Sequence, residues 1–120
     1  MNLIERWAEH MELGPLSNNR RLALTLDRVR VHLIEIHPGQ IIVQARLCDL
    51  PLQTTQRERT IERAGQIALA RLQASASVLT VDEDQSAFWL QKRVQASDLQ
   101  TLERAVEGLV NDIELWRAAL

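Results

Sequence analysis

The spacing of apolar residues changes several times along the chain, and each change predicts a new element of secondary structure. Leu3, Trp7 and Met11 recur at the spacing of one helix face, with charged residues between them. Gly and Pro at positions 14 and 15 disfavour further helix. The pattern predicts a first helix from about Asn2 to Leu13.

Residues 22–47 alternate between apolar and polar positions, and this period of two predicts strands. Two segments, Asp27-Arg28 and His37–Gln40, divide the region into three strands and are short enough to be hairpin turns. Ile34 and Ile36 fall on the opposite parity from the apolar positions before them. They predict either a β-bulge or apolar side chains on the outer face of the sheet.

A second helix is predicted over Arg57–Leu72, after a polar linker. Small side chains at successive turns allow another backbone to approach closely, so this helix either lies on the sheet or meets a second copy of the chain. The stripe of small and apolar residues comprises Ile61, Ala64, Gly65, Ala68 and Leu72.

Two more strands are predicted at residues 77–81 and 86–94, joined by an acidic turn. On the longer strand, Phe88 and Leu90 share one face and Trp89 has the opposite parity. If Phe88 and Leu90 belong to the core, Trp89 points outward. An outward Trp is a candidate contact residue because Trp is enriched at binding hot spots.

The last segment has the most regular amphipathic pattern in the chain. Ser97 and Gln100 have the spacing of a capping box and predict the start of a third helix. The sequence therefore predicts an α+β fold in one domain spanning residues 1–120, with an antiparallel five-stranded sheet and three helices in the order α-β-β-β-α-β-β-α. The apolar stripe of the last helix comprises Leu99, Leu102, Val106, Leu109, Ile113, Trp116 and Leu120.

The charge balance argues against nucleic acid as a partner. Fourteen Lys and Arg against sixteen Asp and Glu give a net charge of -2, so no strong overall positive field is expected. A local group of arginines, which comprises Arg20, Arg21, Arg28 and Arg30, is attributed to solvated strand ends.

The sequence contains no membrane or export signal. No apolar run is long enough to cross a bilayer, and the first residues lack a signal-peptide pattern. We therefore expect a cytoplasmic protein without membrane insertion.

Motifs that carry chemistry are absent from the sequence. There is no phosphate-binding loop, dinucleotide fingerprint, nucleophile elbow or common zinc signature. His10, His32 and His37 are spaced so that their side chains diverge, and Cys48 has no identifiable base. The acidic residues 82–84 lack the glycine and distal glutamate of a calcium loop and are interpreted as a solvated turn. We expect no catalytic residue, no metal site and no cofactor.

The predicted order of elements and the segment V-L-T-V-D-E-D at residues 78–84 carry a resemblance to a known family. The chain resembles the class I chaperones of bacterial type III secretion, the Tir chaperone family. The resemblance implies a homodimer that holds the N-terminal segment of one or more secreted effectors in an extended state. It also implies presentation of that segment to the secretion machinery, with the secretion-system ATPase as a further partner and no ATP hydrolysis by the chaperone.

An extended client can add a strand to an exposed sheet edge and place apolar side chains in grooves. The candidate client-binding residues are Leu3, Trp7 and Met11 of the first helix and Phe88 and Trp89 of the last strand. Burial in the core is the alternative role of the three helix residues.

The resemblance places the dimer contact on the second helix and the strand that follows it. Two other functions stay open at this stage: a dimeric scaffold of the roadblock type that docks a folded regulatory protein, and a small enzyme or ligand-binding domain whose residues converge only in space. The implied dimer contact residues are Ile61, Ala64, Ala68, Val78 and Leu79.

Overall fold

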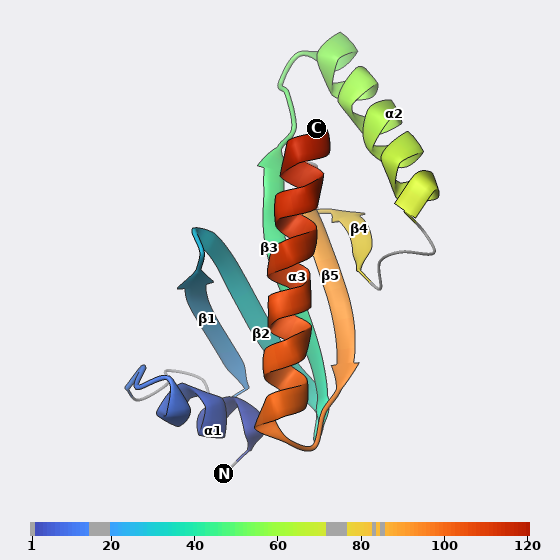
Figure 1. The fold of residues 1–120 in the computed structure, drawn as a ribbon. Coiled ribbons are helices and arrows are strands. Elements are labelled where there is room, and N and C mark those ends of the chain that lie inside the picture. Colours follow the sequence, from blue (N-terminus) through green and yellow to red (C-terminus); the bar gives the residue numbers. More distant parts are fainter. Residues whose placement is uncertain (1, 15–19, 72–76, 83, 85) are drawn as a thin grey trace.

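The computed structural model describes residues 2–14, 20–71, 77–82, 84 and 86–120, and it contains three helices and one sheet of five strands (Figure 1). The strands are β1 (Arg21–Leu26), β2 (Val29–His37), β3 (Gln40–Asp49), β4 (Val78–Val81) and β5 (Ala87–Gln95). The helices are α1 (Leu3–His10), α2 (Thr54–Arg71) and α3 (Leu99–Ala119). The predicted class and element order are confirmed.

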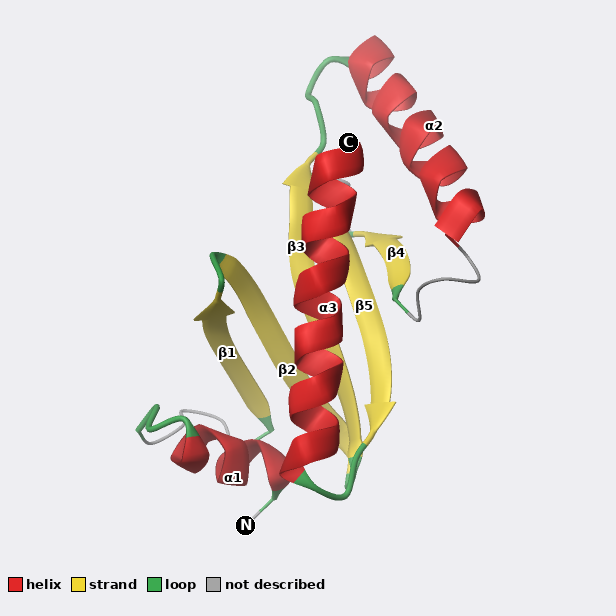
Figure 2. Cartoon of the chain, viewed as in Figure 1, coloured by secondary structure: helices red, strands yellow, loops and turns green. Residues whose placement is uncertain are grey.

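Every neighbouring pair of strands is antiparallel, and their spatial order is β1-β2-β3-β5-β4. β5 therefore lies between β3 and β4, so β1 and β4 are the two edge strands. Figure 2 shows α3 lying along the sheet, with α1 beside the N-terminal end of α3. The side of the sheet that carries α3 is called the inner face below, and the opposite side is called the outer face.

The first hairpin turn depends on two residues with positive φ. Asp27 has a φ of 48° and Arg28 a φ of 68°, the combination that a two-residue hairpin with the twist of its strands requires. At the second turn Gly39 has a φ of 80°, and a Cβ there would lie 3.3 Å from the carbonyl oxygen of Ala96. Both turns occur where the sequence predicts them.

The two isoleucines that break the alternation of β2 have different explanations: Ile34 is an apolar residue of the outer face, and Ile36 lies in a β-bulge. Ile34 pairs with Ile42 in the regular ladder between β2 and β3, and both belong to the outer face. The register shifts between Glu35 and His37, which places Ile36 in a β-bulge with 36% of its surface exposed.

Two helix boundaries differ from the prediction. α1 ends at His10 and not at Leu13, because Met11 forms the C-cap and Glu12 adopts a positive φ of 56°. The predicted capping box of α3 is wrong by one residue: Asp98 is the N-cap and its side chain accepts a hydrogen bond from the Thr101 N–H.

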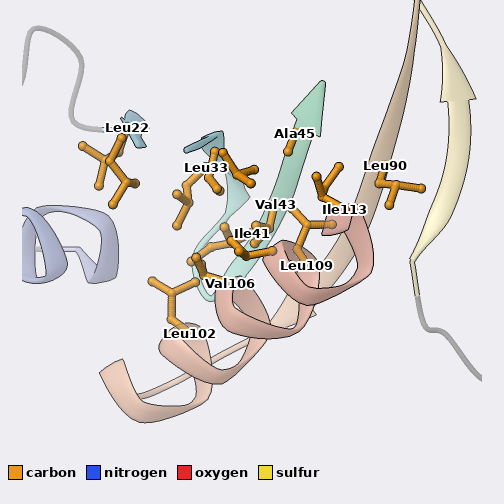
Figure 3. Close-up of a cluster of buried hydrophobic side chains, with 14 of the residues drawn as sticks. Leu22, Leu33, Ile41, Val43, Ala45, Leu90, Leu102, Val106, Leu109 and Ile113 are labelled. Atoms are coloured by element: carbon orange, nitrogen blue, oxygen red, sulfur yellow. The ribbon is translucent and has the colours of Figure 1, made fainter. Parts of the chain in front are cut away.

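The core lies between α3 and the inner face of the sheet (Figure 3). The apolar stripe of α3 meets the inward side chains of β2, β3 and β5, as the alternation in the strands requires. The apolar stripe of α3 thus covers the inward side chains of β2, β3 and β5. The labelled core residues are Leu22, Leu33, Ile41, Val43, Ala45, Leu90, Leu102, Val106, Leu109 and Ile113.

α2 lies at the side of this layered unit, near the C-terminal end of α3 (Figure 1). It begins at Thr54, three residues before the predicted start, and the predicted last residue, Leu72, falls outside the described residues. Ala64 is fully buried in the core cluster, and the Arg63 guanidinium donates to the Ala119 carbonyl oxygen at 3.0 Å. These contacts attach α2 to the end of α3.

Candidate functional site

A groove of ≈ 320 Å³ opens between α1, the turn from β1 to β2, and α3, and is called the α1–α3 groove. Its apolar lining comes from elements far apart in the sequence. Two of the predicted client-binding residues, Trp7 and Met11, are part of it. The groove is lined by Trp7, Met11, Leu26, Asp27, Glu103, Val106, Glu107, Val110 and Asn111.

Trp7 forms the inner wall of the groove, with only 2% of its surface exposed. Its indole Nε1 is buried and has no hydrogen-bond partner among the described residues. A buried donor without a partner carries a desolvation cost of about 1–3 kcal/mol. Met11 is half-buried at the end of α1 and has a flexible thioether side chain, which adapts to apolar groups of different shapes.

Three carboxylates surround the apolar lining. Asp27 comes from the β1–β2 turn, while Glu103 and Glu107 lie one helical turn apart on α3. Glu103 has a partial counter-charge, since one of its carboxylate oxygens lies 3.4 Å from the His10 Nε2 atom. The groove therefore combines an apolar floor with an acidic rim and suits an apolar side chain that has basic neighbours.

The two predicted client-binding residues of β5 lie elsewhere. Phe88 and Trp89 begin β5 beside β4, whereas α1 lies near the opposite end of α3 (Figure 1). Phe88 is 2% exposed and belongs to the core cluster, while Trp89 lies on the outer face and is half-buried. The structure thus divides the five predicted residues into two groups, and Leu3, 7% exposed, is a core residue of the first group.

Trp89 has polar and aromatic neighbours on the outer face. Its indole N–H donates to the Asp82 carboxylate at 3.4 Å, and its ring lies 5.7 Å from the ring of His32. Burial, followed by the positive charge of Arg30, lowers the pKa of His32, so the imidazole is neutral at pH 7. Trp89 is held in place on both sides.

Asp82 organises the turn between β4 and β5. Its carboxylate accepts hydrogen bonds from the N–H groups of Ser86 and Ala87 and from the Ser86 hydroxyl, at 2.8, 3.0 and 2.9 Å. Desolvation acts to raise the pKa of Asp82, but the bonds from Ala87, Ser86 and Trp89 together lower the pKa far below its usual value. This carboxylate has a structural role in the turn.

The predicted dimer-contact residues do not share one environment. Ala64 is buried and Ala68 is half-buried against the core cluster, whereas Ile61 is 42% exposed. Leu69, which the sequence analysis did not include, is 74% exposed on the same side of α2 as Ile61 and Gly65. The small-residue stripe is therefore split between an inward side and an exposed side of α2.

The nearby edge strand β4 adds further exposed apolar side chains. Val78 is 60% exposed and Val81 is 43% exposed, whereas Leu79 is half-buried and pairs with Leu90. Val78 pairs with Gln91 and Val81 with Phe88, so the edge strand exposes one valine on each of its faces. The exposed residues Ile61 and Leu69 of α2 and Val78 and Val81 of β4 are together called the α2–β4 surface below.

In the part of the chain that the structure describes, no group of His, Cys, Asp and Glu has a metal-binding arrangement, and no helix is long and apolar enough to span a membrane. Burial, and next the carboxylate of Asp49, raise the pKa of the Cys48 thiol, which disfavours the nucleophilic thiolate.

Sequence reasoning missed most of the α1–α3 groove because its walls come from three elements. The sequence does indicate the wall that α3 provides, because residues three or four apart share a helix face. Glu103, Glu107, Val106 and Val110 have this spacing. The contribution of Leu26 and the β1–β2 turn depends on tertiary packing and has no such signal.

Comparison with known proteins identifies one family. The model of the Tir chaperone protein (CesT) family matches residues 2–117, while no curated protein matches the sequence. The observed order of helices and strands also agrees with the secretion-chaperone prediction.

Solved structures share the fold at low sequence identity. A chain of the ExoU–SpcU complex from the type III secretion system of Pseudomonas aeruginosa superposes with a TM-score of 0.69, at 17% identity, covering 98% of this chain and 97% of that chain. A chain of the HopA1–SchA chaperone–effector complex gives 0.66 at 17% identity, covering 97% and 91%. A chain from the structure of the Yersinia pestis type III secretion chaperone SycH in complex with a stable fragment of YscM2 gives 0.62 at 20% identity, covering 94% and 95%.

Proposed function

Because the chain belongs to the Tir chaperone protein (CesT) family of type III secretion chaperones, we propose that it binds the extended N-terminal segment of one or more secreted effectors and keeps it competent for secretion. The observation that carries this proposal is the family match over residues 2–117. Similar folds occur in structures of complexes between chaperones and effectors, which supports an effector as the partner. The family is one of chaperones and not of enzymes.

The edge strand β1 supports strand addition by the client. β1 pairs with β2 and has no second strand neighbour among the described residues. An extended polypeptide can hydrogen-bond to such an edge through its main chain, which requires no particular client sequence. Strand addition thus explains how one chaperone can hold segments of different sequence.

The α1–α3 groove supplies the side-chain part of the proposed binding. It lies beside β1, because Leu26 ends that strand and lines the groove. A client strand on the β1 edge presents alternate side chains toward the helices, and an apolar one among them can enter between Met11 and Val106. The acidic rim favours client segments with Lys or Arg next to that side chain.

Of the five residues predicted to bind the client, Met11 and Trp7 are supported by the groove. Trp89 is supported by its partial exposure on the outer face. Leu3 and Phe88 are buried in the core, so we propose that neither contacts the client directly. Leu3 would instead hold α1 in position, and Phe88 would hold the start of β5 in position.

We propose a homodimer formed through the α2–β4 surface, with Ile61 and Val78 in contact with the second copy. Ala64, Ala68 and Leu79 lie behind these residues and fix the orientation of α2 and β4. Exposed apolar residues on an edge strand and an adjacent helix are typical of a surface that another chain covers. The dimer would act in the bacterial cytoplasm and deliver its client to the secretion-system ATPase.

Limited proteolysis tests the client-binding proposal. N-terminal segments of secreted effectors from the same bacterium are digested with and without the chaperone, and at least one segment is expected to survive only in its presence. Met11→Gln should weaken this protection about tenfold or more in midpoint concentration, because it places a polar amide in the apolar groove.

Leu13→Gln is the matched control. Leu13 lies two residues further along the chain, is 43% exposed and does not line the groove, so this variant should protect the client as well as the unmodified protein does. Equal protection by both variants would exclude the α1–α3 groove as the binding site. Absence of protection for every effector segment would contradict the function itself.

A further inference from the structure

The outer face of the sheet carries a regular row of four side chains across four strands. Arg21 of β1 pairs with Ile34 of β2, Ile34 pairs with Ile42 of β3, and Ile42 pairs with Arg93 of β5. These positions alternate with the buried residues of the inner face, so their side chains point away from α3. The arginine–isoleucine row therefore has two aliphatic groups at its centre and a guanidinium at each end.

The two arginines are available to a partner. Arg21 and Arg93 are exposed, and neither forms an ion pair with a described residue. Ile34 and Ile42 are half-buried, so each still presents part of its side chain to solvent.

The other arginines of this face differ in their partners. Arg30 donates to the Thr25 hydroxyl at 3.4 Å and adds a positive charge near the row. Arg46 is neutralised by its ion pair with Asp49 at 2.6 Å, so the unpaired positive charge of the row comes from Arg21 and Arg93.

We propose that the arginine–isoleucine row binds an extended acidic segment of a partner polypeptide, with carboxylates four residues apart and an aliphatic side chain midway between them. Neighbouring strands lie about 4.8 Å apart, so the backbones at Arg21 and Arg93 are separated by about 14 Å. In an extended chain four residues also span about 14 Å, and side chains at i, i+2 and i+4 point to the same side.

The match in length assigns each group of the partner to a position on the row. The two carboxylates meet the guanidinium groups of Arg21 and Arg93, which can bind them in a bidentate manner. The aliphatic side chain covers Ile34 and Ile42 and removes their remaining surface from water. The row lies on the outer face and shares no residue with the α1–α3 groove, although Arg21 belongs to the edge strand β1. The proposal rests on the row itself and not on the proposed client-binding function.

A polypeptide fits this row better than a nucleic acid does. The centre of the row is aliphatic, which favours another aliphatic group over a phosphodiester backbone. Binding of single strands typically uses a continuous positive groove with aromatic residues for base stacking, whereas this row places its charges at two separated points.

Three synthetic peptides of seven residues test the proposal by nuclear magnetic resonance. The first, S-E-T-L-T-E-S, has the proposed spacing. The second replaces both Glu residues by Gln, and the third, S-E-L-E-T-T-S, has the composition of the first with its carboxylates two residues apart. The first peptide should shift the methyl signals of Ile34 and Ile42 in a saturable way, with affinity about tenfold or more above that of the other two.

Two double variants locate the site. Arg21→Gln with Arg93→Gln should abolish the preference for the first peptide, because both guanidinium groups are lost. Arg6→Gln with Arg104→Gln makes the same change in net charge at exposed positions on α1 and α3 and should leave the preference intact.

Several results would overturn the proposal. These are the absence of saturable methyl shifts, equal affinity for the three peptides, and displacement of the first peptide by a single-stranded oligonucleotide that binds more tightly. If the double variant at Arg21 and Arg93 instead changed the molecular mass of the protein in solution, the row would be a contact between copies of the chain, which also contradicts the proposal.

Discussion

Leu69→Gln is predicted to weaken the proposed homodimer without destabilising the protomer. Leu69 is 74% exposed in the isolated chain, and Leu and Gln have similar helix propensities. The substitution should therefore change the free energy of unfolding of one protomer by no more than about 0.5 kcal/mol. Any larger effect must arise from contact with a second copy.

The expected loss follows from the exposed fraction. Complete burial of a Leu side chain stabilises by about 1.5–3 kcal/mol, so covering the 74% of Leu69 that is exposed contributes about 1–2 kcal/mol. A two-fold symmetric dimer contains this residue twice, which gives about 2–4 kcal/mol. The dissociation constant should rise by a factor of roughly 30 to 1,000, since about 1.4 kcal/mol corresponds to a tenfold change.

Sedimentation equilibrium over a range of protein concentrations measures this constant directly. Leu13→Gln provides a control, since Leu13 is also exposed but follows α1 and lies away from α2 and β4. The control should dimerise as the unmodified protein does. An unchanged dissociation constant for Leu69→Gln, or an equal loss in both variants, would refute the assignment of the dimer contact to the α2–β4 surface.

Three further predictions concern stability. The pKa of Asp82 is lower in the folded than in the unfolded chain, so the ionised carboxylate stabilises the fold fully above the unfolded pKa of about 4, and this stabilisation is lost as the pH falls below that value. The melting temperature of the unmodified protein should therefore drop more between pH 6 and pH 3 than that of Asp82→Asn. An equal drop in both proteins would contradict this prediction. Gly65→Ala, made in the Leu69→Gln background, should raise the free energy of unfolding in urea by about 0.8–1 kcal/mol, because a Cβ at Gly65 meets no atom within 4 Å; a decrease would be inconsistent with the exposed helix face. Ile113→Ala should cost about 2–5 kcal/mol in the same assay, since Ile113 is fully buried between α3 and the sheet, and a loss below about 1 kcal/mol would argue against this core.

The fold was predictable because the hydrophobic period alone distinguishes helix from strand in this chain. The alternation in residues 22–47 and the spacing of the stripe in α3 both result from burial on one face, and the structure confirms that burial. Helix ends were less predictable, since Ser97 and Asp98 are both good N-cap residues and the local backbone decides between them.

The candidate site was only partly predictable. Trp7 and Met11 are recognisable as apolar residues of a helix, but the sequence does not encode that Leu26 and Val106 approach them from other elements. The stripe on α2 shows the same difficulty, because docking against the end of α3 decides which of its residues are buried. Patterns along one element predict a face, whereas a site requires the relative positions of several elements.

Hydrogen–deuterium exchange with and without a bound effector segment tests the central claim most directly. If the chain holds an extended client on the β1 edge and in the α1–α3 groove, amide groups of β1 should exchange more slowly in the complex, and so should those around Met11. The bound effector segment should itself gain protection without forming a compact domain. A complex that leaves β1 and α1 unchanged, or an effector segment that remains unprotected, would contradict the account.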